Sequence, residues 1–351
     1  MSRTALRAAV IGLGVGERHL ATYEEYARCS VVALCDLDER RLEEVARTRP
    51  ECRVTTNAAD ILSAPDIDVV SIASYDTDHG GQVFAAIASG KHVFVEKPLC
   101  LRDEEFERIV AALNEHPGVQ LSSNLLLRRA PQFVELKERI EAGSLGRLFY
   151  LEGDYHYGRI EKIVGGWRGQ IPFYSVTHGG AIHLIDLVLW LTGGRVCEVV
   201  AMGNQIATTG TQFRYPDMVT ALLRFDDGMT AKISANFGCV LPHSHALSAF
   251  GTMGTFVQTI QGGAFYQSRD PQVLPEVILP RQHDAKRDVQ RAFVAQLLDG
   301  MPGLVSTEDV LAAMAVSLAV ERSLSSHRWE EVEYAHARGT VMPQATTGLI
   351  S

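Results

Sequence analysis

A short apolar run that ends in closely spaced glycines constrains the fold of this chain more than any other feature of its sequence. Residues 7–11 (RAAVI) predict a buried strand, and Gly12, Gly14 and Gly16 follow it at the start of a helical stretch. This order opens a dinucleotide-binding unit, because the first glycine permits a tight turn and the second lets the backbone approach a pyrophosphate at the helix N-terminus. The third glycine of that pattern would fall at Glu17, so Gly16 comes one residue early.

The first third of the chain alternates short apolar strands with helices. This alternation predicts a parallel sheet with helices on both faces, in which ligands bind beyond the carboxyl ends of the strands. We therefore expect an α/β domain of the doubly wound, Rossmann type over residues 1–124. Its expected strands are 7–11, 31–35, 68–72, 92–95 and 119–122, and its expected helices are the stretch through Arg28, then 38–49, 82–89 and 103–114.

Asp36 stands at the end of the second expected strand, about 20 residues after the glycine turn, where dinucleotide-binding domains place an acidic residue. A carboxylate there accepts hydrogen bonds from the hydroxyls of the adenosine ribose and repels a 2′-phosphate. The glycine turn and Asp36 together predict that the chain binds a dinucleotide, and NAD rather than NADP. The alternative interpretation is that Asp36 only ends a strand in a turn.

The second half of the chain changes character, because from about Leu148 strands follow one another with few helices between them. This pattern predicts an α+β domain over residues 125–335, with a large, mostly antiparallel open sheet that packs one face on helices. Gly228 marks a hairpin within it, and residues 336–351 read as a loosely structured tail. The expected strands are 147–155, 196–205, 218–225, 229–237 and 246–250, followed by helices 286–299 and 306–325.

The composition narrows the class of protein. The formal net charge is −9, with no run of lysines and arginines, which argues against nucleic acid or an anionic membrane as partner. Six cysteines are scattered without a CxxC pair, a pattern typical of a reduced, cytosolic protein and not of a disulfide framework or a zinc site. No signal peptide and no apolar stretch of the roughly 20 residues of a membrane span is found. We expect a soluble cytoplasmic protein.

The segment HGGAIHLID, residues 178–186, opens a helix that is apolar on all sides and therefore predicted to be buried. Yet it begins with His178 and His183, and Asp186 follows one helical turn after the second histidine. Titratable groups at the start of a buried helix indicate a site that moves protons. The alternatives are a core histidine with a satisfied hydrogen bond at His183 and a supporting hydrogen bond or cap at Asp186.

Four stretches of the sequence resemble the Gfo/Idh/MocA oxidoreductase family, and the resemblance spans nearly the whole chain. It implies a Rossmann domain, a mixed second domain whose open sheet commonly forms dimers or tetramers, and reversible hydride transfer between NAD(P) and a secondary alcohol of a sugar or cyclitol. The stretches are GKHVFVEKPLC (90–100), ERIEAGSLGRLFYLEGDY (138–155), GGAIHLIDLVLWLTG (179–193) and STEDVLAAMAVSLAVERSLSSHRWEEV (306–332).

The resemblance assigns roles to single residues. It makes Lys97 and His183 catalytic, and it implies a cis peptide bond before Pro98 that holds Lys97 in place. Many members have an acid four positions before the histidine, where this chain has Gly179. The family needs no metal, and His178 lies off the helical stripe that a metal set would require. The residues assigned to the cofactor are Gly12, Leu13, Gly14, Val15, Asp36, Ser74, His79, Glu96 and Lys97.

The segment from Tyr155 to His178 is rich in aromatic and basic side chains. Aromatic faces stack against sugar C–H surfaces, and arginines hold carboxylates or phosphates bidentately, so this composition favours an oxidised, phosphorylated or nucleotide-linked sugar. The alternative is a solvated loop with a few anchoring aromatic residues. The residues assigned to the substrate are Tyr155, Arg159, Trp167, Arg168, Tyr174 and His178.

Three functions remain open on the sequence. The first is an NAD-dependent dehydrogenase in which His183 takes the hydroxyl proton, His178 supports the substrate, and the substrate ring occupies the space beside Gly179. The second is an NAD-using glycoside hydrolase, which shows no net redox change, because one branch of the family works in this way. The third is a sensing regulator that binds NAD without turnover. The expected partners are a small sugar or cyclitol and further copies of the chain, as a homodimer or homotetramer through the second sheet.

Overall fold

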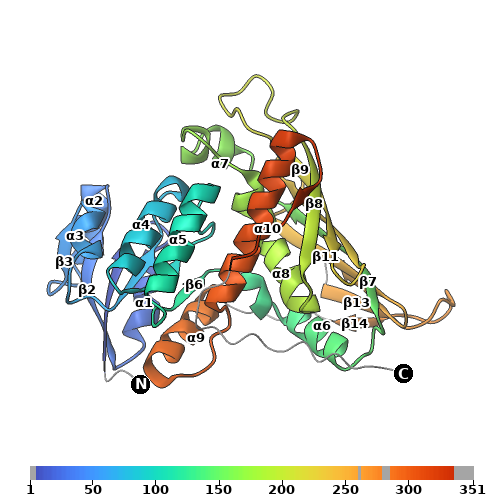
Figure 1. Ribbon diagram of the computed structural model, residues 1–351, viewed down its shortest axis with the longest axis horizontal. Coiled ribbons are helices and arrows are strands. Elements are labelled where there is room, and N and C mark those ends of the chain that lie inside the picture. Colours follow the sequence, from blue (N-terminus) through green and yellow to red (C-terminus); the bar gives the residue numbers. More distant parts are fainter. Residues whose placement is uncertain (1–4, 260–261, 279–284, 336–351) are drawn as a thin grey trace.

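Two sheets organise the chain in the computed structural model, which describes residues 5–259, 262–278 and 285–335 (Figure 1). The predicted tail at 336–351 lies outside the described residues. The first sheet is parallel, with the order β3-β2-β1-β4-β5-β6, and helices cover it, as predicted. Its strands are β1 (Leu6–Ile11), β2 (Cys29–Cys35), β3 (Arg53–Thr55), β4 (Val69–Ile72), β5 (His92–Val95) and β6 (Leu121–Ser123), and its helices are α1 (Glu17–Glu24), α2 (Glu39–Ala46), α3 (Ala58–Leu62), α4 (Asp76–Ala88) and α5 (Asp103–Glu115).

The structure differs from the sequence prediction most clearly at three places in this half, besides shifts of up to three residues at the ends of β2, α2 and β6. Strand β3 and helix α3 were not predicted, because β3 is a short edge strand whose residues are polar or partly exposed. Helix α4 begins at Asp76 rather than at residue 82. The predicted start was too late because the first turns of this helix contain two glycines, which are poor helix formers. Gly80 is nevertheless suited to this helix, because a Cβ there would lie only 2.7 Å from Cδ of Glu105 on α5. Helix α1 ends at Glu24, four residues before the predicted end.

The second sheet has nine strands in the order β14-β13-β12-β11-β7-β10-β9-β8-β15. All its pairings are antiparallel within the described residues except the central pair β7–β10, which is parallel. Gly228, with φ +88°, forms the predicted hairpin between β9 and β10. The strands are β7 (Leu148–His156), β8 (Val196–Asn204), β9 (Met218–Phe225), β10 (Thr230–Asn236), β11 (Ser244–Gly251), β12 (Thr255–Thr259), β13 (Gly262–Tyr266), β14 (Glu276–Ile278) and β15 (Glu330–Glu331).

Helices connect the two sheets. Helix α10 lies between the two halves (Figure 1) and contacts α8, β8 and also β6 of the first sheet. Ser306 and Asp309 form a capping box at its start, and α9 packs on α1. These helices are α6 (Pro131–Glu141), α7 (Glu161–Val164), α8 (Ile182–Thr192), α9 (Ala285–Asp299) and α10 (Thr307–Ser326), with 3₁₀ turns at η1 (Leu126–Arg129) and η2 (Trp167–Gly169) and a π-helical turn at η3 (Thr177–Ala181).

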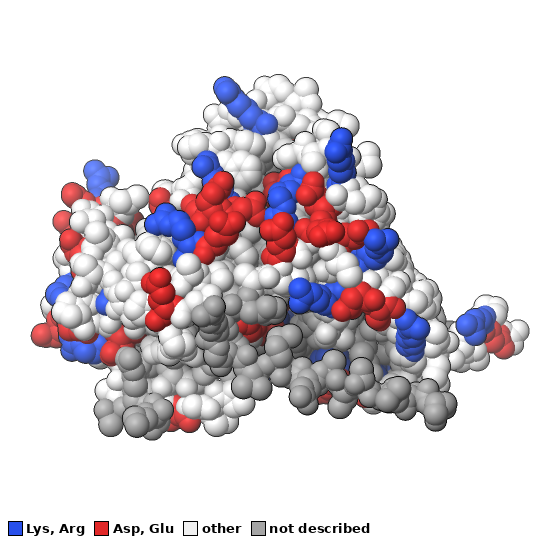
Figure 2. Space-filling model, in the orientation of Figure 1, with Lys and Arg blue, Asp and Glu red and all other residues white. Residues whose placement is uncertain are grey.

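The face of the molecule shown in Figure 2 carries interspersed acidic and basic side chains, with acidic ones gathered over α5 and α10. It does not present the continuous basic surface that nucleic acids require. Among the described residues, no helix is both long enough and apolar enough to cross a membrane.

Candidate active site

The glycine turn after β1 has the geometry of a phosphate-binding loop. Gly12 has φ +85°, and a Cβ on it would collide with the carbonyl of Ala73. Gly16 precedes α1 and would collide with the carbonyl oxygen of Gly12 if it had a side chain. Gly14, in contrast, has nothing within 4 Å of its Cβ position. Gly16 therefore packs the helix against the strand although it comes one residue early, while Gly14 leaves its side open for a ligand.

Asp36 follows β2 and lies at the same edge of the sheet as the glycine turn. Its carboxylate accepts hydrogen bonds from the backbone N–H of Leu13 at 2.5 Å and of Asp38 at 2.9 Å. One basic side chain next to this turn is Arg41, which donates to the carbonyl of Leu13 at 3.3 Å. The Arg41 guanidinium is already paired with Glu17 and Glu44. Two carboxylates thus neutralise the charge of Arg41.

Lys97 joins the two halves of the molecule. It follows β5, and its peptide bond to Pro98 is cis, as the family resemblance implies. Its Nζ donates a hydrogen bond of 3.0 Å to the carbonyl of Gly179, in the π-helical turn before α8. Burial lowers the pKa of Lys97, and the carboxylates of Asp76 and Glu96 only partly offset this effect. The ammonium group is therefore held at the start of the helix that carries His183.

Glu96 anchors the end of β5 beside Lys97. Its Oε1 accepts a hydrogen bond of 2.8 Å from Nδ2 of Asn124 and lies 3.3 Å from Nε2 of His19. Burial would raise the pKa of Glu96, but His19, Asn124 and Lys97 outweigh it and lower that pKa to about 2. Glu96 is therefore a carboxylate that fixes the strand end.

His79 and Ser74, both assigned to the cofactor, have partners within the protein. His79 is buried, with Nδ1 2.7 Å from the carbonyl oxygen of Pro98 and Nε2 3.2 Å from that of Ser74. The Ser74 hydroxyl donates to Gln82 at 2.8 Å. This arrangement ties the turn after β4 to the turn after β5, so His79 positions both turns; a direct contact with the cofactor stays a prediction.

Two glycines before His183 make room for two tyrosines. A Cβ on Gly180 would lie 2.5 Å from Cδ1 of Tyr155, and one on Gly179 would overlap the hydroxyl of Tyr174. The expectation that a substrate ring occupies the space beside Gly179 is therefore wrong, because Tyr174 fills that space. His183 itself is 6% exposed and lies with its ring centroid 6.5 Å from that of Tyr155.

His178 lies in the π-helical turn and has no exposed surface. Its Nδ1 is 2.7 Å from the hydroxyl of Ser317 on α10, and its backbone N–H donates to the hydroxyl of Ser175. Burial lowers the pKa of His178, which agrees with the expectation of a neutral imidazole at this helix start. These contacts favour a role in positioning η3 on α10 over a direct contact with substrate.

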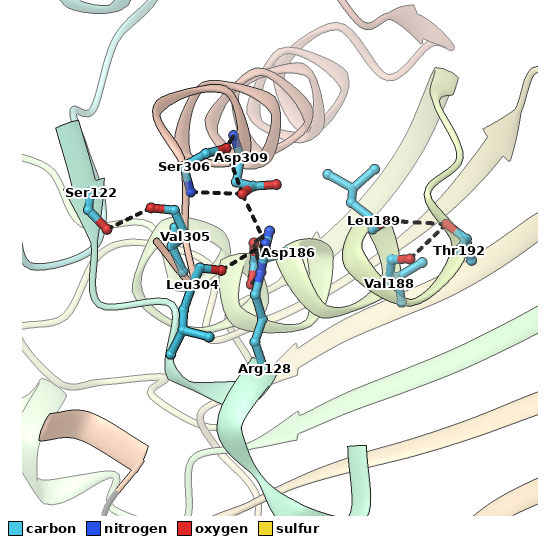
Figure 3. A network of polar contacts seen from close by, with 10 residues as sticks. All are labelled: Ser122, Arg128, Asp186, Val188, Leu189, Thr192, Leu304, Val305, Ser306 and Asp309. Carbon is cyan, nitrogen blue, oxygen red and sulfur yellow. Dashed lines mark hydrogen bonds and ion pairs between the residues drawn. The ribbon is translucent and has the colours of Figure 1, made fainter. Parts of the chain in front are cut away.

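Asp186 belongs to a buried network that fixes α8, shown in Figure 3. It accepts hydrogen bonds from Nε and Nη2 of Arg128, whose Nη1 also lies 3.0 Å from Oδ2 of Asp309 on α10. Arg128 further donates to the carbonyl of Leu304. The carboxylates of Asp186 and Asp309 raise the pKa of Arg128 against the effect of burial. Asp186 therefore holds helix α8 in place, which agrees with the alternative interpretation of Asp186 as a supporting hydrogen-bond partner.

The aromatic and basic segment divides into two groups in the structure. Tyr155 faces His183, and Arg159 lies 4.7 Å above the ring of Tyr157. Trp167, Arg168 and Tyr174 form the other group. Arg168 lies 4.4 Å over the ring of Trp167, and Trp167 packs 5.0 Å from Tyr75 of the first domain.

Sequence reasoning missed three residues of this site. His243 and His245 lie on β11 or just before it, and His245 has its ring centroid 5.6 Å from that of His183. The sequence pattern that could have identified these histidines is the alternation in HSHALSA (243–249), which places His243, His245 and Leu247 on one face of a strand. Asp76 is 8% exposed and close enough to Lys97 to oppose the fall in its pKa. Within the described residues, no three His, Cys, Asp or Glu side chains group as a metal ion requires.

Comparison with known proteins adds the following. The family model described as "Oxidoreductase family, NAD-binding Rossmann fold" matches residues 6–124, and "GFO/IDH/MocA C-terminal domain" matches residues 133–257. The chain is 28% identical over 335 residues to inositol 2-dehydrogenase 2 of Paenarthrobacter aurescens, covering 92% of this chain and 96% of that protein. It is 26% identical to the myo-inositol 2-dehydrogenase of Thermotoga maritima, covering 93% and 99%. A levoglucosan dehydrogenase in complex with NADH and L-sorbose shares the fold, with TM-score 0.81, 21% identity and coverage of 94% and 99%.

Proposed function

The chain belongs to the Gfo/Idh/MocA family of oxidoreductases, and on this premise we propose that it is an NAD-dependent dehydrogenase acting on a secondary hydroxyl of a sugar, sugar acid or cyclitol. Relatives named inositol 2-dehydrogenase align with almost the whole chain, which supports oxidation of a CH–OH group. We further propose that residues 1–124 and 125–335 are its two domains.

The hydrogen bond from Lys97 to the carbonyl of Gly179 is the observation that carries this proposal. It brings the lysine at the carboxyl end of β5 to the start of the helix that presents His183. Oxidation of an alcohol removes a hydride from carbon and a proton from oxygen, and bound NAD would accept the hydride. His183 takes the proton. Lys97 donates a hydrogen bond to the developing alkoxide and stabilises its charge.

Neighbouring side chains hold these two groups in place. The rings of Tyr155 and His245 lie next to each other beside His183, with centroids 6.5 and 5.6 Å from that of His183 and 4.8 Å from one another. The carboxylate of Asp76, which the sequence analysis did not identify, favours the charged form of Lys97. Asp76 thus supplies an acid near the reacting centre from the first half of the chain, whereas position 179 in the second half is a glycine and supplies none.

NAD is the proposed cofactor rather than NADP. The backbone around Gly14 and the carboxylate of Asp36 fit a pyrophosphate and a ribose with free hydroxyls. A 2′-phosphate would meet Asp36 and would need a free cation. Arg41, which stands beside Leu13, is paired with Glu17 and Glu44.

The assembly and the compartment are proposals as well. Several large apolar side chains of the second sheet are exposed, Phe149 at 53% and Leu222 at 47% among them, which supports a homodimer or homotetramer through this sheet. The cysteines of the described chain are free, which supports the cytoplasm as compartment.

The direct test is to follow NADH absorbance while the purified protein and NAD are offered a panel of sugars, sugar acids and cyclitols. The proposal expects net formation of NADH with at least one of them. Hydrolysis of a glycoside without net redox change would identify the glycoside hydrolase instead. Binding of NADH and of a sugar without any turnover would identify a sensing regulator.

A further inference from the structure

The inner face of the second sheet ends in a row of ring-bearing side chains next to His183. Tyr155 on β7 pairs directly with His245 on β11, and their ring centroids are 4.8 Å apart. Because side chains on a strand alternate, His243 faces the same way as His245, and their rings are 5.2 Å apart. This row presents ring faces and ring nitrogens beside the proposed reacting centre.

Arg159 extends this row as a cation with an unused hydrogen-bond donor. It follows β7, and its guanidinium lies 4.7 Å from the ring centroid of Tyr157. Its Nε is buried and has no hydrogen-bond partner, and no carboxylate pairs with Arg159 in the part of the chain that the structure describes. Nε2 of His245 is buried without a partner as well. Buried polar groups without partners are costly. Nε of Arg159 is a donor, and Nε2 of His245 can donate in one tautomer of the neutral imidazole, so these two neighbouring groups indicate that an acceptor arrives with a ligand.

The charge around these donors is positive. Burial lowers the pKa of His245 to about 3, and electrostatic interactions with His243, Arg159, Lys97 and His156 act in the same direction. His245 is therefore a neutral imidazole near pH 7. Asp76 lies within electrostatic reach of Lys97 and Arg168. Among the described residues no carboxylate is paired with Arg159 in this way, and Gly179 has no side chain that could carry a charge.

We infer that the substrate is a sugar acid whose carboxylate binds Arg159 and the ring nitrogen of His245, while its reacting hydroxyl lies between Lys97 and His183. This inference rests on the dehydrogenase function proposed above. A carboxylate fits better than a phosphate, because a phosphate carries nearly two charges, whereas Arg159 is the one cation among the described side chains of this row. Arg168 is stacked on Trp167 and lies beside Tyr174.

Binding to the enzyme–NADH complex, followed by NADH fluorescence, tests this inference without requiring turnover. The acids are D-glucuronate, D-galacturonate, D-gluconate and D-galactonate, each compared with D-glucose, D-galactose, D-glucitol or galactitol as its neutral counterpart. At least one acid should bind more than about tenfold more tightly than its counterpart. Equal or weaker binding of all acids overturns the inference, as does tighter binding of glucose 6-phosphate than of any acid.

Variants of Arg159 locate the carboxylate. Arg159→Met should weaken binding of the preferred acid by about 10- to 100-fold, the range for a hydrogen bond to a charged group, and Arg159→Lys should restore part of it. Binding of the neutral counterpart should change by less than about threefold. Arg214→Met is the matched control, since Arg214 is exposed in the loop between β8 and β9, and it should bind the acid like the wild type. An equal loss for acid and neutral sugar in Arg159→Met overturns the inference.

Turnover in the same samples separates this inference from the proposed function. NADH formation with neutral cyclitols as efficient as with acids would leave the dehydrogenase in place and overturn the preference for a carboxylate. Tight, Arg159-dependent binding of an acid without any NADH formation would support the carboxylate site and contradict the dehydrogenase.

Discussion

The hydroxyl of Tyr174 occupies the position that a side chain on Gly179 would need. The two residues are therefore a matched pair, in which the absence of one side chain permits the other. Tyr174 is 2% exposed, and burial raises the pKa of its hydroxyl well above the ordinary value, although Arg168 opposes this. A neutral phenol thus fills the space that a side chain at position 179 would take.

The first prediction concerns this pair. Gly179→Ala should lower the free energy of unfolding by roughly 1–3 kcal/mol, as overpacking of a buried site does. In a Tyr174→Ala background the same substitution should cost much less, because the colliding ring is gone. Gly81→Ala is the control, since Gly81 lies in α4 with nothing within 4 Å of its Cβ position, and it should be neutral or stabilising. Equal costs of Gly179→Ala in both backgrounds would show that the residues are not coupled.

The second prediction concerns the cofactor. Asp36→Ser should weaken binding of NAD and strengthen binding of NADP, because the carboxylate that meets the 2′-phosphate is removed. Titration of wild type and variant with NADH and NADPH, followed by their fluorescence, measures both effects. A wild type that prefers NADPH by about tenfold, or about 1.4 kcal/mol, would contradict the assignment to NAD.

The third prediction concerns pH and the histidine row. The pKa of His245 is lowered from 6.5 to about 3 in the folded protein, so the unfolded chain binds the extra proton between these values. Stability should therefore be lost as the pH falls below 6.5. Between pH 8 and pH 5.5 this group should contribute a loss of roughly 1.4 kcal/mol, which His245→Gln removes.

Chemical denaturation at the two pH values measures this difference. Replacement of the exposed His327 is the control, with Asn chosen because residue 327 has φ 57°. That variant should keep the pH dependence of the wild type. If His245→Gln keeps it as well, His245 does not have the depressed pKa described here.

The fourth prediction concerns Lys97. Lys97→Met should lower kcat by at least ~10² because it removes the donor to the developing alkoxide, whereas NADH binding should change by less than about threefold. Lys162→Met makes the same change at an exposed lysine of α7 and should retain wild-type kcat. Steady-state kinetics and NADH fluorescence provide the two readouts. A Lys97→Met enzyme with near-normal kcat would remove this residue from the mechanism.

The sequence predicts the central strands well because each is an uninterrupted apolar run. All four residues of β4 and all four of β5 are buried, and such runs are typical of parallel strands covered on both faces. Strand β3 lacks this signal, since it lies at an edge and is partly exposed. The same physical property, burial on both faces, thus explains what could and could not be predicted.

The candidate site is harder to predict than the fold, because its parts meet only through packing. His183 and Lys97 carry recognisable motifs, but His245 reaches His183 through pairing of β11 with β7. The contact between Tyr174 and Gly179 depends on the path of the segment between η2 and η3. Neither contact follows from local sequence periodicity, which describes one element at a time.

The central claim is that His183 takes the proton beside Lys97, and the most direct test is the pH profile of kcat for wild type and His183→Ala. The variant should lose ~10²–10⁴ in kcat, the range for a general base, and should lose the acidic limb of the profile, while its NADH affinity stays within about threefold of wild type. His178→Ala, in which the residue bonded to Ser317 is removed, should retain that limb. A His183→Ala enzyme with the rate and profile of the wild type would contradict the account.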